Sequence, residues 1–449
     1  RSATSRQQPN IIVVFIDDAG YADYSSYGNT RVKTENIDRM AAEGLRFTQF
    51  YVNSPICSPS RTALVTGQYP ARWRITSYID NRALNAKRGM AQFLDPQAPM
   101  LARFLKEAGY RTGHFGKWHL GGGRDVGEAP LPAAYGFDAS LTQFEGLGDR
   151  VLPIFDAHDG SPARKAPLGV ASEKLGQGQI TWMDRCQMTR AFVDGALSFI
   201  KKAEDESRPF YVNLWPDDVH SPFFPPAGTR GDGSKHALFD AVLKHMDEQL
   251  GPLFDYVRSN PKLRDNTLIL ITNDNGPEPG AGSAGVFRNG KGTLYEGGVR
   301  EPLIVWGPGF VPASKRGQWD KTTVLSSVDL VPSLLKLARV APTASTKFDG
   351  KFDGVDVSGA LLGKPLGARA KPLFWKRPPD RPGPPEARWP DLAVRDREWK
   401  LLLNEDSSGV ELYHVLRDPA ESNNLAAQHP EIVRRLGEAV RAWNSTLPH

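Results

Sequence analysis

The chain has 449 residues, of which 40% are hydrophobic and 24% charged, a composition typical of folded proteins and unlike that of a disordered chain. Its longest uninterrupted apolar run, residues 11–16, is far shorter than the roughly 20 residues that a membrane span requires. Lysine and arginine (56 residues) only slightly outnumber aspartate and glutamate (51), and no basic run indicates a nucleic-acid partner.

Up to about residue 365, the chain alternates between strand-like and helix-like patterns. Residues 10–16 form a β-branched run, typical of a strand buried on both faces, and residues 34–44 predict a helix capped by Thr34. Further along, the patterns predict helices over residues 100–108, 184–204, 235–258 and 328–337, and strands over residues 111–118, 210–215, 267–272 and 302–306. This alternation predicts an α/β fold, with a large, mostly parallel sheet sandwiched by helices.

The pattern changes near residue 365. Short strands are predicted at residues 373–375, 392–394, 399–403 and 411–413, followed by a helix over residues 431–443. We therefore expect a catalytic α/β domain over residues 1–365 and a small C-terminal subdomain, an antiparallel sheet plus a helix, over residues 366–449. The proline-rich residues 377–389 are interpreted either as a solvated linker or as a loop over the active site.

The segment Cys57-Ser-Pro-Ser-Arg61 is the most specific motif. Pro59 suits the first turn of a helix, which would place Cys57 at the helix N-terminus, where free N–H groups favour an anion. Arg61 follows four residues later and returns to the same face of the helix. From this spacing alone, a buried cysteine beside an exposed arginine is the alternative. The only other cysteine is Cys186, so a disulfide framework is excluded.

Two acidic groups follow predicted strands. Asp17 and Asp18 come directly after the strand at residues 10–16, and Asp274 and Asn275 follow the strand at residues 267–272. In doubly wound sheets, ligands bind beyond the carboxyl ends of the strands. Four hard oxygen ligands at two such ends favour Ca²⁺ or Mg²⁺. The second group alone would be equally typical of a turn.

Basic side chains occur near other strand ends. Lys117 and His119 are two residues apart, so both point to one face of their strand. His220 follows the strand at residues 210–215, and Lys291 precedes the strand at residues 302–306. Each alone is typical of a solvated surface, but together, beside a hard-cation site, they indicate a pocket for a tetrahedral oxyanion.

In these motifs and in their order, the chain resembles the type I, formylglycine-dependent sulfatases of the alkaline phosphatase superfamily over nearly its full length. The resemblance implies an alkaline-phosphatase-like fold, and oxidation of Cys57 to Cα-formylglycine by a maturation enzyme. It implies Ca²⁺, rather than Mg²⁺, bound by Asp17, Asp18, Asp274 and Asn275. The sulfate-pocket residues it implies are Arg61, Lys117, His119, His220 and Lys291. In the implied mechanism, His220 protonates the leaving oxygen and His119 accepts a proton from the second hydroxyl of the hydrated aldehyde.

We therefore expect a sulfatase acting on a sulfated small molecule, with a sulfated saccharide favoured. The residue types of the sulfate pocket also suit a phosphodiesterase or phosphonate monoester hydrolase of the same superfamily, or an arylsulfatase with no saccharide preference. A non-catalytic protein that binds sulfated glycans is disfavoured by the intact set of site residues. The first residue is Arg1, not Met, which favours a removed targeting segment or a trimmed chain, and we expect a periplasmic or secreted protein.

Overall fold

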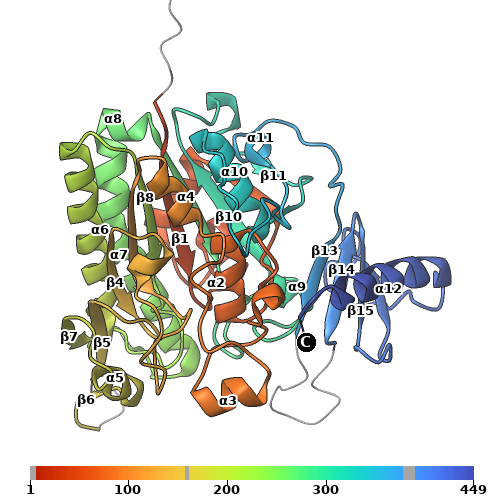
Figure 1. Cartoon of the computed structure of the whole chain (residues 1–449), viewed down its shortest axis with the longest axis horizontal. Coiled ribbons are helices and arrows are strands. Elements are labelled where there is room, and N and C mark those ends of the chain that lie inside the picture. Colours follow the sequence, from red (N-terminus) through yellow and green to blue (C-terminus); the bar gives the residue numbers. More distant parts are fainter. Residues whose placement is uncertain (1–6, 157–160, 378–389, 449) are drawn as a thin grey trace, which may run out of the picture.

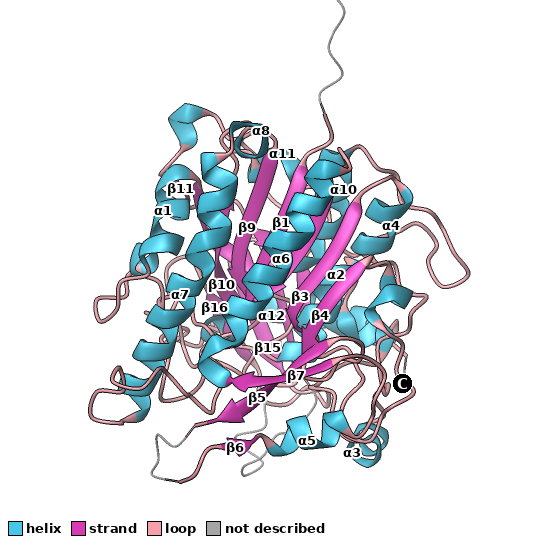
Figure 2. Ribbon diagram, turned by 90° about the vertical axis from the view of Figure 1, so that its left-hand side faces the viewer, coloured by secondary structure: helices cyan, strands magenta, loops and turns pink. Residues whose placement is uncertain are grey.

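The computed structural model describes residues 7–156, 161–377 and 390–448 (Figures 1 and 2). Its centre is a 12-stranded sheet. The parallel strands at the middle of this sheet are, in spatial order, β9 (Thr267–Asn273), β1 (Asn10–Ile16), β8 (Phe210–Trp215), β3 (Arg111–Lys117) and β4 (Ala139–Gln143). The structure confirms the predicted fold class, because the strands that form the middle of the sheet are parallel.

The two margins of the sheet depart from this pattern. On one side, β10 (Arg300–Trp306) is antiparallel to both β9 and β2 (Leu45–Tyr51), and β11 (Trp319–Asp320) and β12 (Leu325–Ser326) pair with β2. On the other side, β5 (Arg150–Phe155) pairs with β4, with β6 (Arg164–Lys165) and with β7 (Ile180–Asp184). The strands β2, β4, β5 and β7 are absent from the sequence-based prediction.

Helices cover both faces of the sheet. The helices on one face, in front of the sheet in Figure 2, are α1 (Glu35–Glu43), α6 (Met188–Asp205), α7 (Lys235–Ser259) and α8 (Pro261–Arg264). Those on the other face are α2 (Cys57–Thr66), α4 (Leu101–Glu107), α10 (Leu330–Ala338) and α11 (Ser358–Leu361). A hydrophobic core lies on each face of the sheet, and strand β1 contributes to both, because successive side chains of a strand point to opposite faces. Ile12 and Val14 pack on the α6 side, and Ile11 and Val13 pack on the α2 side.

The helix predicted over residues 184–204 starts later than expected. Residues 180–184 pair with β5, so the α-helix begins only at Met188. None of the helices in the described ranges is both long and apolar enough to cross a membrane. Three short helices complete this part of the chain: α3 (Arg82–Lys87), α5 (Pro167–Glu173) and α9 (Glu296–Val299).

The C-terminal residues form a separate antiparallel sheet, coloured blue in Figure 1. Its strands are β13 (Leu373–Lys376), β14 (Leu392–Asp396), β15 (Trp399–Leu403) and β16 (Glu411–His414), and α12 (Pro430–Ser445) packs on it. Leu392 and Val394 contact the helix through Leu436 and Val440. The helix coincides with the one predicted over residues 431–443, and it buries an apolar stripe against the sheet.

Candidate active site

The predicted site residues meet at the carboxyl end of the central strands, on the side where α3 and α5 lie in Figure 1. Asp17 and Asp18 follow β1, Asp274 and Asn275 follow β9, and Lys117 is the last residue of β3. Parallel strands end at one edge of a sheet, so residues far apart in the sequence come together there. Helix α2 reaches the same place and begins at Cys57, with Pro59 in its first turn, as predicted.

Three ion pairs fix the inner part of the site. Nη2 of Arg61 lies 2.9 Å from Oδ1 of Asp17 and 2.9 Å from Oδ2 of Asp274. Nζ of Lys117 lies 2.5 Å from Oδ2 of Asp17. These side chains are buried. Although burial opposes ionisation, Lys117 and the neighbouring cations hold the pKa of Asp17 well below its ordinary value.

Asp18 organises the outer part of the site. Its Oδ2 lies 2.6 Å from Nζ of Lys291 and 3.7 Å from Nε2 of His220. Its Oδ1 accepts a hydrogen bond from Nδ2 of Asn275 at 2.8 Å. Its backbone N–H donates to Oδ1 of Asp274 at 3.1 Å, which joins the outer part to the inner part.

We call Asp17, Asp18, Asp274 and Asn275 the acidic cluster. All four are buried, and they offer carboxylate and amide oxygens, the ligands that Ca²⁺ and Mg²⁺ prefer. Oδ1 of Asn275 has no hydrogen-bond partner among the described residues. Burial and the nearby Asp17 carboxylate raise the pKa of Asp274 well above its ordinary value. An unpartnered amide oxygen beside three buried carboxyl groups fits a hard divalent cation.

Cys57 lies next to these charged groups. Ligand atoms of Asp17, Asp18, Cys57 and His220 all lie within 4.8 Å of one another. Burial raises the pKa of the Cys57 thiol to about 12, despite the opposing charges of Lys117 and Lys291. The thiol is therefore protonated at neutral pH, and an unmodified cysteine here is a poor nucleophile.

The two predicted histidines are held in defined tautomers. Nε2 of His119 lies 3.0 Å from the carbonyl oxygen of Ile79, and Nδ1 of His220 lies 2.6 Å from that of Ser221. Because a carbonyl only accepts, each of these nitrogens carries the proton. Burial, reinforced by Lys117 for His119 and by Lys291 for His220, lowers both pKa values. Each neutral ring therefore keeps one basic nitrogen, Nδ1 in His119 and Nε2 in His220.

These residues open into a cavity of about 740 Å³, hereafter the reaction cavity. Four of the ten predicted site residues line this cavity: Cys57, His119, His220 and Lys291. The other six lie directly behind the cavity wall, in the ion pairs and hydrogen bonds described above. Arg377 also lines it; the rest of the proline-rich stretch, residues 378–389, lies outside the described residues, and its predicted role stays untested.

Further lining residues were not predicted. The loop after β4 contributes Phe144 and Glu145, and the loop after β3 contributes Arg124. All three have a left-handed backbone, as do His119 and Asp18. Such conformations are uncommon outside glycine and cluster at functional sites. The only signal in the sequence is the polar, glycine-rich run that follows β4, a strand that the prediction missed.

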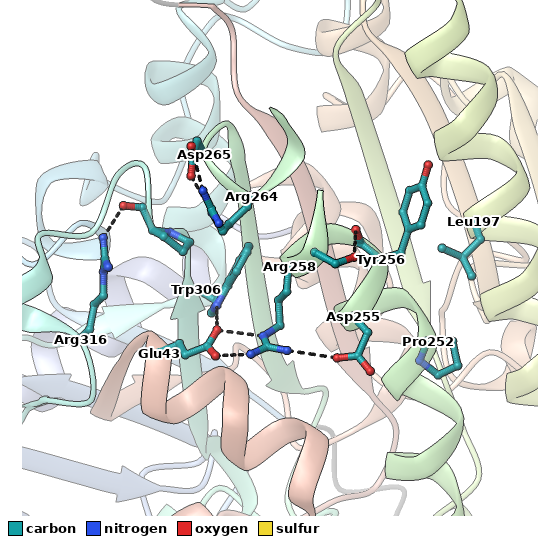
Figure 3. A pocket seen from close by; sticks show the side chains of 12 residues that line it. Glu43, Leu197, Pro252, Asp255, Tyr256, Arg258, Arg264, Asp265, Trp306 and Arg316 are labelled. Atoms are coloured by element: carbon teal, nitrogen blue, oxygen red, sulfur yellow. Dashed lines mark hydrogen bonds and ion pairs between the residues drawn. The ribbon is translucent and has the colours of Figure 1, made fainter. Parts of the chain in front are cut away.

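A second cavity, of about 820 Å³, lies at the opposite edge of the sheet (Figure 3). It is lined by side chains around the end of β10 and the start of β9, including Trp306 and Asp265. Arg258 pairs there with Glu43 and with Asp255, and Arg264 pairs with Asp265. Because these charges neutralise one another on the surface, this cavity lacks the concentrated charge of the reaction cavity.

Known proteins resemble this chain in sequence and in fold. The family model described as Sulfatase matches residues 9–340. The chain is 34% identical to N-acetylgalactosamine-6-sulfatase of Canis lupus familiaris, over 84% of this chain and 70% of that protein. It is 32% identical to arylsulfatase A of Bos taurus, over 96% of this chain and 82% of that protein. The crystal structure of Ps i-CgsB in complex with k-i-k-neocarrahexaose has a TM-score of 0.78 at 23% identity, covering 97% of this chain and 93% of that chain, a likeness of fold.

Proposed function

Because the chain belongs to the sulfatase family, we propose that this sulfuric ester hydrolase removes sulfate from a carbohydrate in the reaction cavity. One observation carries the proposal: buried Cys57 lies within 4.8 Å of the ligand atoms of two carboxylates and a histidine, beside three cationic side chains. The cations Arg61, Lys117 and Lys291 suit the three oxygens of a sulfate ester, and they are fixed before substrate arrives. Preorganised charges of this kind are usually the largest contribution to catalysis.

Cys57 is the residue that we propose to be modified. Its buried, protonated thiol is unsuited to attack on sulfur, whereas its place at the start of α2 suits an oxygen nucleophile. Oxidation to Cα-formylglycine by a maturation enzyme would supply a hydrated aldehyde, with one hydroxyl to attack and a second to release the sulfate. Asp274, whose charge acts on Cys57, is the group that we propose to accept the proton of the attacking hydroxyl.

The acidic cluster would hold one divalent cation, with Ca²⁺ favoured over Mg²⁺ because so many protein oxygens converge. The ion would act as a Lewis acid toward a sulfate oxygen. The residues of the chain fit this role without rearrangement of the fold, since Asp17, Asp18, Asp274 and Asn275 are already buried together.

The histidines would move protons at different atoms. Nε2 of His220 faces Asp18 and the cavity, so it is the atom that would protonate the leaving oxygen. The pKa of His220 is lowered by burial and by Lys291, and the negative charge of a bound sulfate would raise it. Nδ1 of His119 is buried without a hydrogen-bond partner among the described residues, so it can accept a proton.

The carbohydrate substrate is supported by the N-acetylgalactosamine-6-sulfatase relative, and by polar residues such as Arg124 and Glu145 in the cavity wall. An aryl sulfate is the second candidate. Leu152, Phe155 and Leu168 form an apolar part of the wall, and arylsulfatase A is also a relative. The expected periplasmic or secreted location remains a proposal that cell fractionation would test.

The decisive experiment combines mass spectrometry with turnover. The protein would be produced together with a formylglycine-generating enzyme and assayed on N-acetylgalactosamine 6-sulfate, p-nitrophenyl sulfate and a bis-p-nitrophenyl phosphate diester. We expect the aldehyde or its hydrate at position 57, and sulfate turnover far above diester turnover. Cys57→Ala should abolish activity. The matched control is Cys186→Ala, at the half-buried second cysteine, which should leave activity unchanged. Full activity with an unmodified thiol, or faster diester turnover, would overturn the proposal.

A further inference from the structure

Glu145 places a buried carboxylate in the wall of the reaction cavity. Its side chain is only 3% exposed, and its Oε1 accepts from Nε of Arg124 at 2.9 Å. The other oxygen, Oε2, is buried and has no hydrogen-bond partner among the described residues. A buried carboxylate oxygen without a donor is costly, so a donor that reached Oε2 from the cavity would relieve that cost.

The surrounding backbone is shaped around this carboxylate. A Cβ atom on Gly123 would lie 2.1 Å from Oε2 of Glu145, so any larger residue at position 123 would displace the carboxylate from this position. The φ angles of Phe144 and Glu145 are 51° and 58°, and that of Arg124 is 55°. Left-handed backbone is unfavourable at residues other than glycine, and it persists where the surrounding structure enforces it. These features indicate a built site rather than an incidental surface residue.

The neighbouring residue ties this carboxylate to the reaction centre. The ring of Phe144 lies 4.8 Å from that of His119 and 6.4 Å from that of His220, centroid to centroid. Nζ of Lys117 lies 5.1 Å from the centre of the Phe144 ring. Glu145 is therefore close to the reacting groups. A carboxylate repels a sulfate, so the sulfate binds at the cations, and Glu145 is left to face the alcohol portion of the substrate.

The local charge indicates which alcohol portions are favoured. Nη1 of Arg124 lies 3.4 Å from Oδ1 of Asp80, so one guanidinium is shared by Asp80 and Glu145. Lys117 also acts on Glu145, but it is paired with Asp17, so the two carboxylates are left to share Arg124. Hydroxyl and amide N–H groups would stabilise the Glu145 carboxylate by donating to Oε2, whereas a second anion would be repelled by it.

We propose that Glu145 is a specificity-determining residue, whose Oε2 accepts a hydrogen bond from a neutral hydroxyl or amide N–H donor on the alcohol portion of the substrate. Together with Arg124 and Asp80, it disfavours substrates that carry a second sulfate or a carboxylate at that position. This inference rests on the proposed carbohydrate sulfatase function. Burial raises the pKa of Glu145 to about 7, so the carboxyl group is only partly ionised at neutral pH, and a substrate donor at Oε2 would favour its ionised form.

Three substrates and two variants test the inference in fully matured enzyme. The substrates are N-acetylgalactosamine 6-sulfate, which carries donors, its 4,6-disulfate, which adds a second anion, and p-nitrophenyl sulfate, which has no donor. Glu145→Ala should lower kcat/KM for the monosulfate by about 10- to 100-fold, since hydrogen bonds to charged groups are worth about 1.5–3 kcal/mol. Turnover of p-nitrophenyl sulfate should change less than about threefold.

Glu145→Gln keeps the shape of the side chain and removes its charge. It should narrow the wild-type preference for the monosulfate over the disulfate by about fivefold or more, because the repulsion of the second anion is weakened. The matched control is Glu128→Gln, at a glutamate whose side chain is 52% exposed and paired with Arg82. This control should leave all three rates unchanged, and melting temperatures would verify that every variant is folded.

The outcomes separate this inference from the proposed function. If the wild type hydrolyses p-nitrophenyl sulfate but neither saccharide, the carbohydrate proposal fails, and the inference fails with it. If the wild type hydrolyses the monosulfate and Glu145→Ala lowers all three rates equally, Glu145 has only a structural role and the inference alone is wrong. An unchanged ratio of monosulfate to disulfate turnover in Glu145→Gln would likewise overturn it.

Discussion

Lys400 provides a quantitative test of how the C-terminal sheet is joined to the rest of the chain. It lies on β15, is fully buried, and its Nζ is 3.0 Å from Oε1 of Glu296 and 3.0 Å from Oε1 of Glu421. Glu296 is the first residue of α9, shortly after Lys291 in the sequence. We predict that Lys400→Met destabilises the protein strongly, because it leaves buried carboxylates without their shared cation.

The magnitude follows from the charges. Burial by itself would raise the pKa of Glu296. The positive charge of Lys400, followed by those of Arg300 and Arg395, nevertheless holds this pKa at about 2, against 4.5 for a free glutamate. At about 1.4 kcal/mol per pKa unit, this difference corresponds to about 3.5 kcal/mol of favourable interaction. Removing one partner of a buried ion pair typically costs about 3–5 kcal/mol. We therefore expect a loss of about 3–5 kcal/mol in the free energy of unfolding at neutral pH.

The assay is urea unfolding, followed by circular dichroism and by hydrogen exchange of β13 to β16. Faster exchange in those strands would locate the loss at the C-terminal sheet. Lys351→Met is the matched control, since that side chain is 85% exposed. It should change the free energy of unfolding by less than about 0.5 kcal/mol.

A double variant checks the cause of the loss. If uncompensated carboxylate charge is responsible, Lys400→Met combined with Glu421→Gln should be more stable than Lys400→Met alone, because one buried charge is removed. A Lys400→Met protein as stable as the wild type would refute the reasoning. So would a double variant whose gain over Lys400→Met is no larger than the gain that Glu421→Gln alone gives over the wild type.

Three further predictions concern the acidic cluster, His220 and Glu421. Exhaustive chelation should lower both the melting temperature and the activity, and added Ca²⁺ should restore both; no change in either would contradict a resident cation. His220→Ala should slow desulfation of a saccharide by about 10²- to 10⁴-fold but affect p-nitrophenyl sulfate much less, because p-nitrophenolate leaves without a proton; equal losses would leave His220 as a sulfate binder only. Burial raises the pKa of Glu421 to about 7, above its ordinary 4.5, so its ionisation costs stability as pH rises through that window. Glu421→Gln should therefore match the wild type near pH 4.5 and exceed it by up to about 3 kcal/mol near pH 8, measured by urea unfolding at both pH values.

The sequence determined the elements with strong local patterns. The β-branched run at residues 10–16 coincides with β1, and the helix predicted over residues 235–258 coincides with α7, Lys235–Ser259. Both patterns depend only on neighbouring residues, since a buried strand is apolar throughout and an amphipathic helix repeats every 3.6 residues. The sequence also predicted that Asp17 and Asp274 lie close together, because each follows a strand and parallel strands end at a common edge of the sheet.

The weakly patterned margins of the sheet could not be predicted this way. Strands β4 and β7 are only partly buried, and their mixed polar sequences carry no continuous apolar signal. They are strands because neighbouring strands already offer free backbone groups: β4 pairs with β3, and β7 with β5. Their existence depends on a partner that is itself placed by the fold, so local propensity does not reveal it.

The same distinction applies to the site. Motif order and predicted element ends led to the prediction that Cys57, Lys117 and Lys291 belong to one anion pocket, although each lysine alone is typical of a solvated surface. Only the tertiary structure brought Glu145 against Arg124, and Lys400 between two glutamates from distant segments. Such contacts form only when the whole chain has folded, and their energies depend on burial and on charges that are distant in the sequence. No local sequence pattern encodes burial or distance. For this reason the sequence did not indicate Glu145, the carboxylate that we propose to face the substrate, and only the folded structure did.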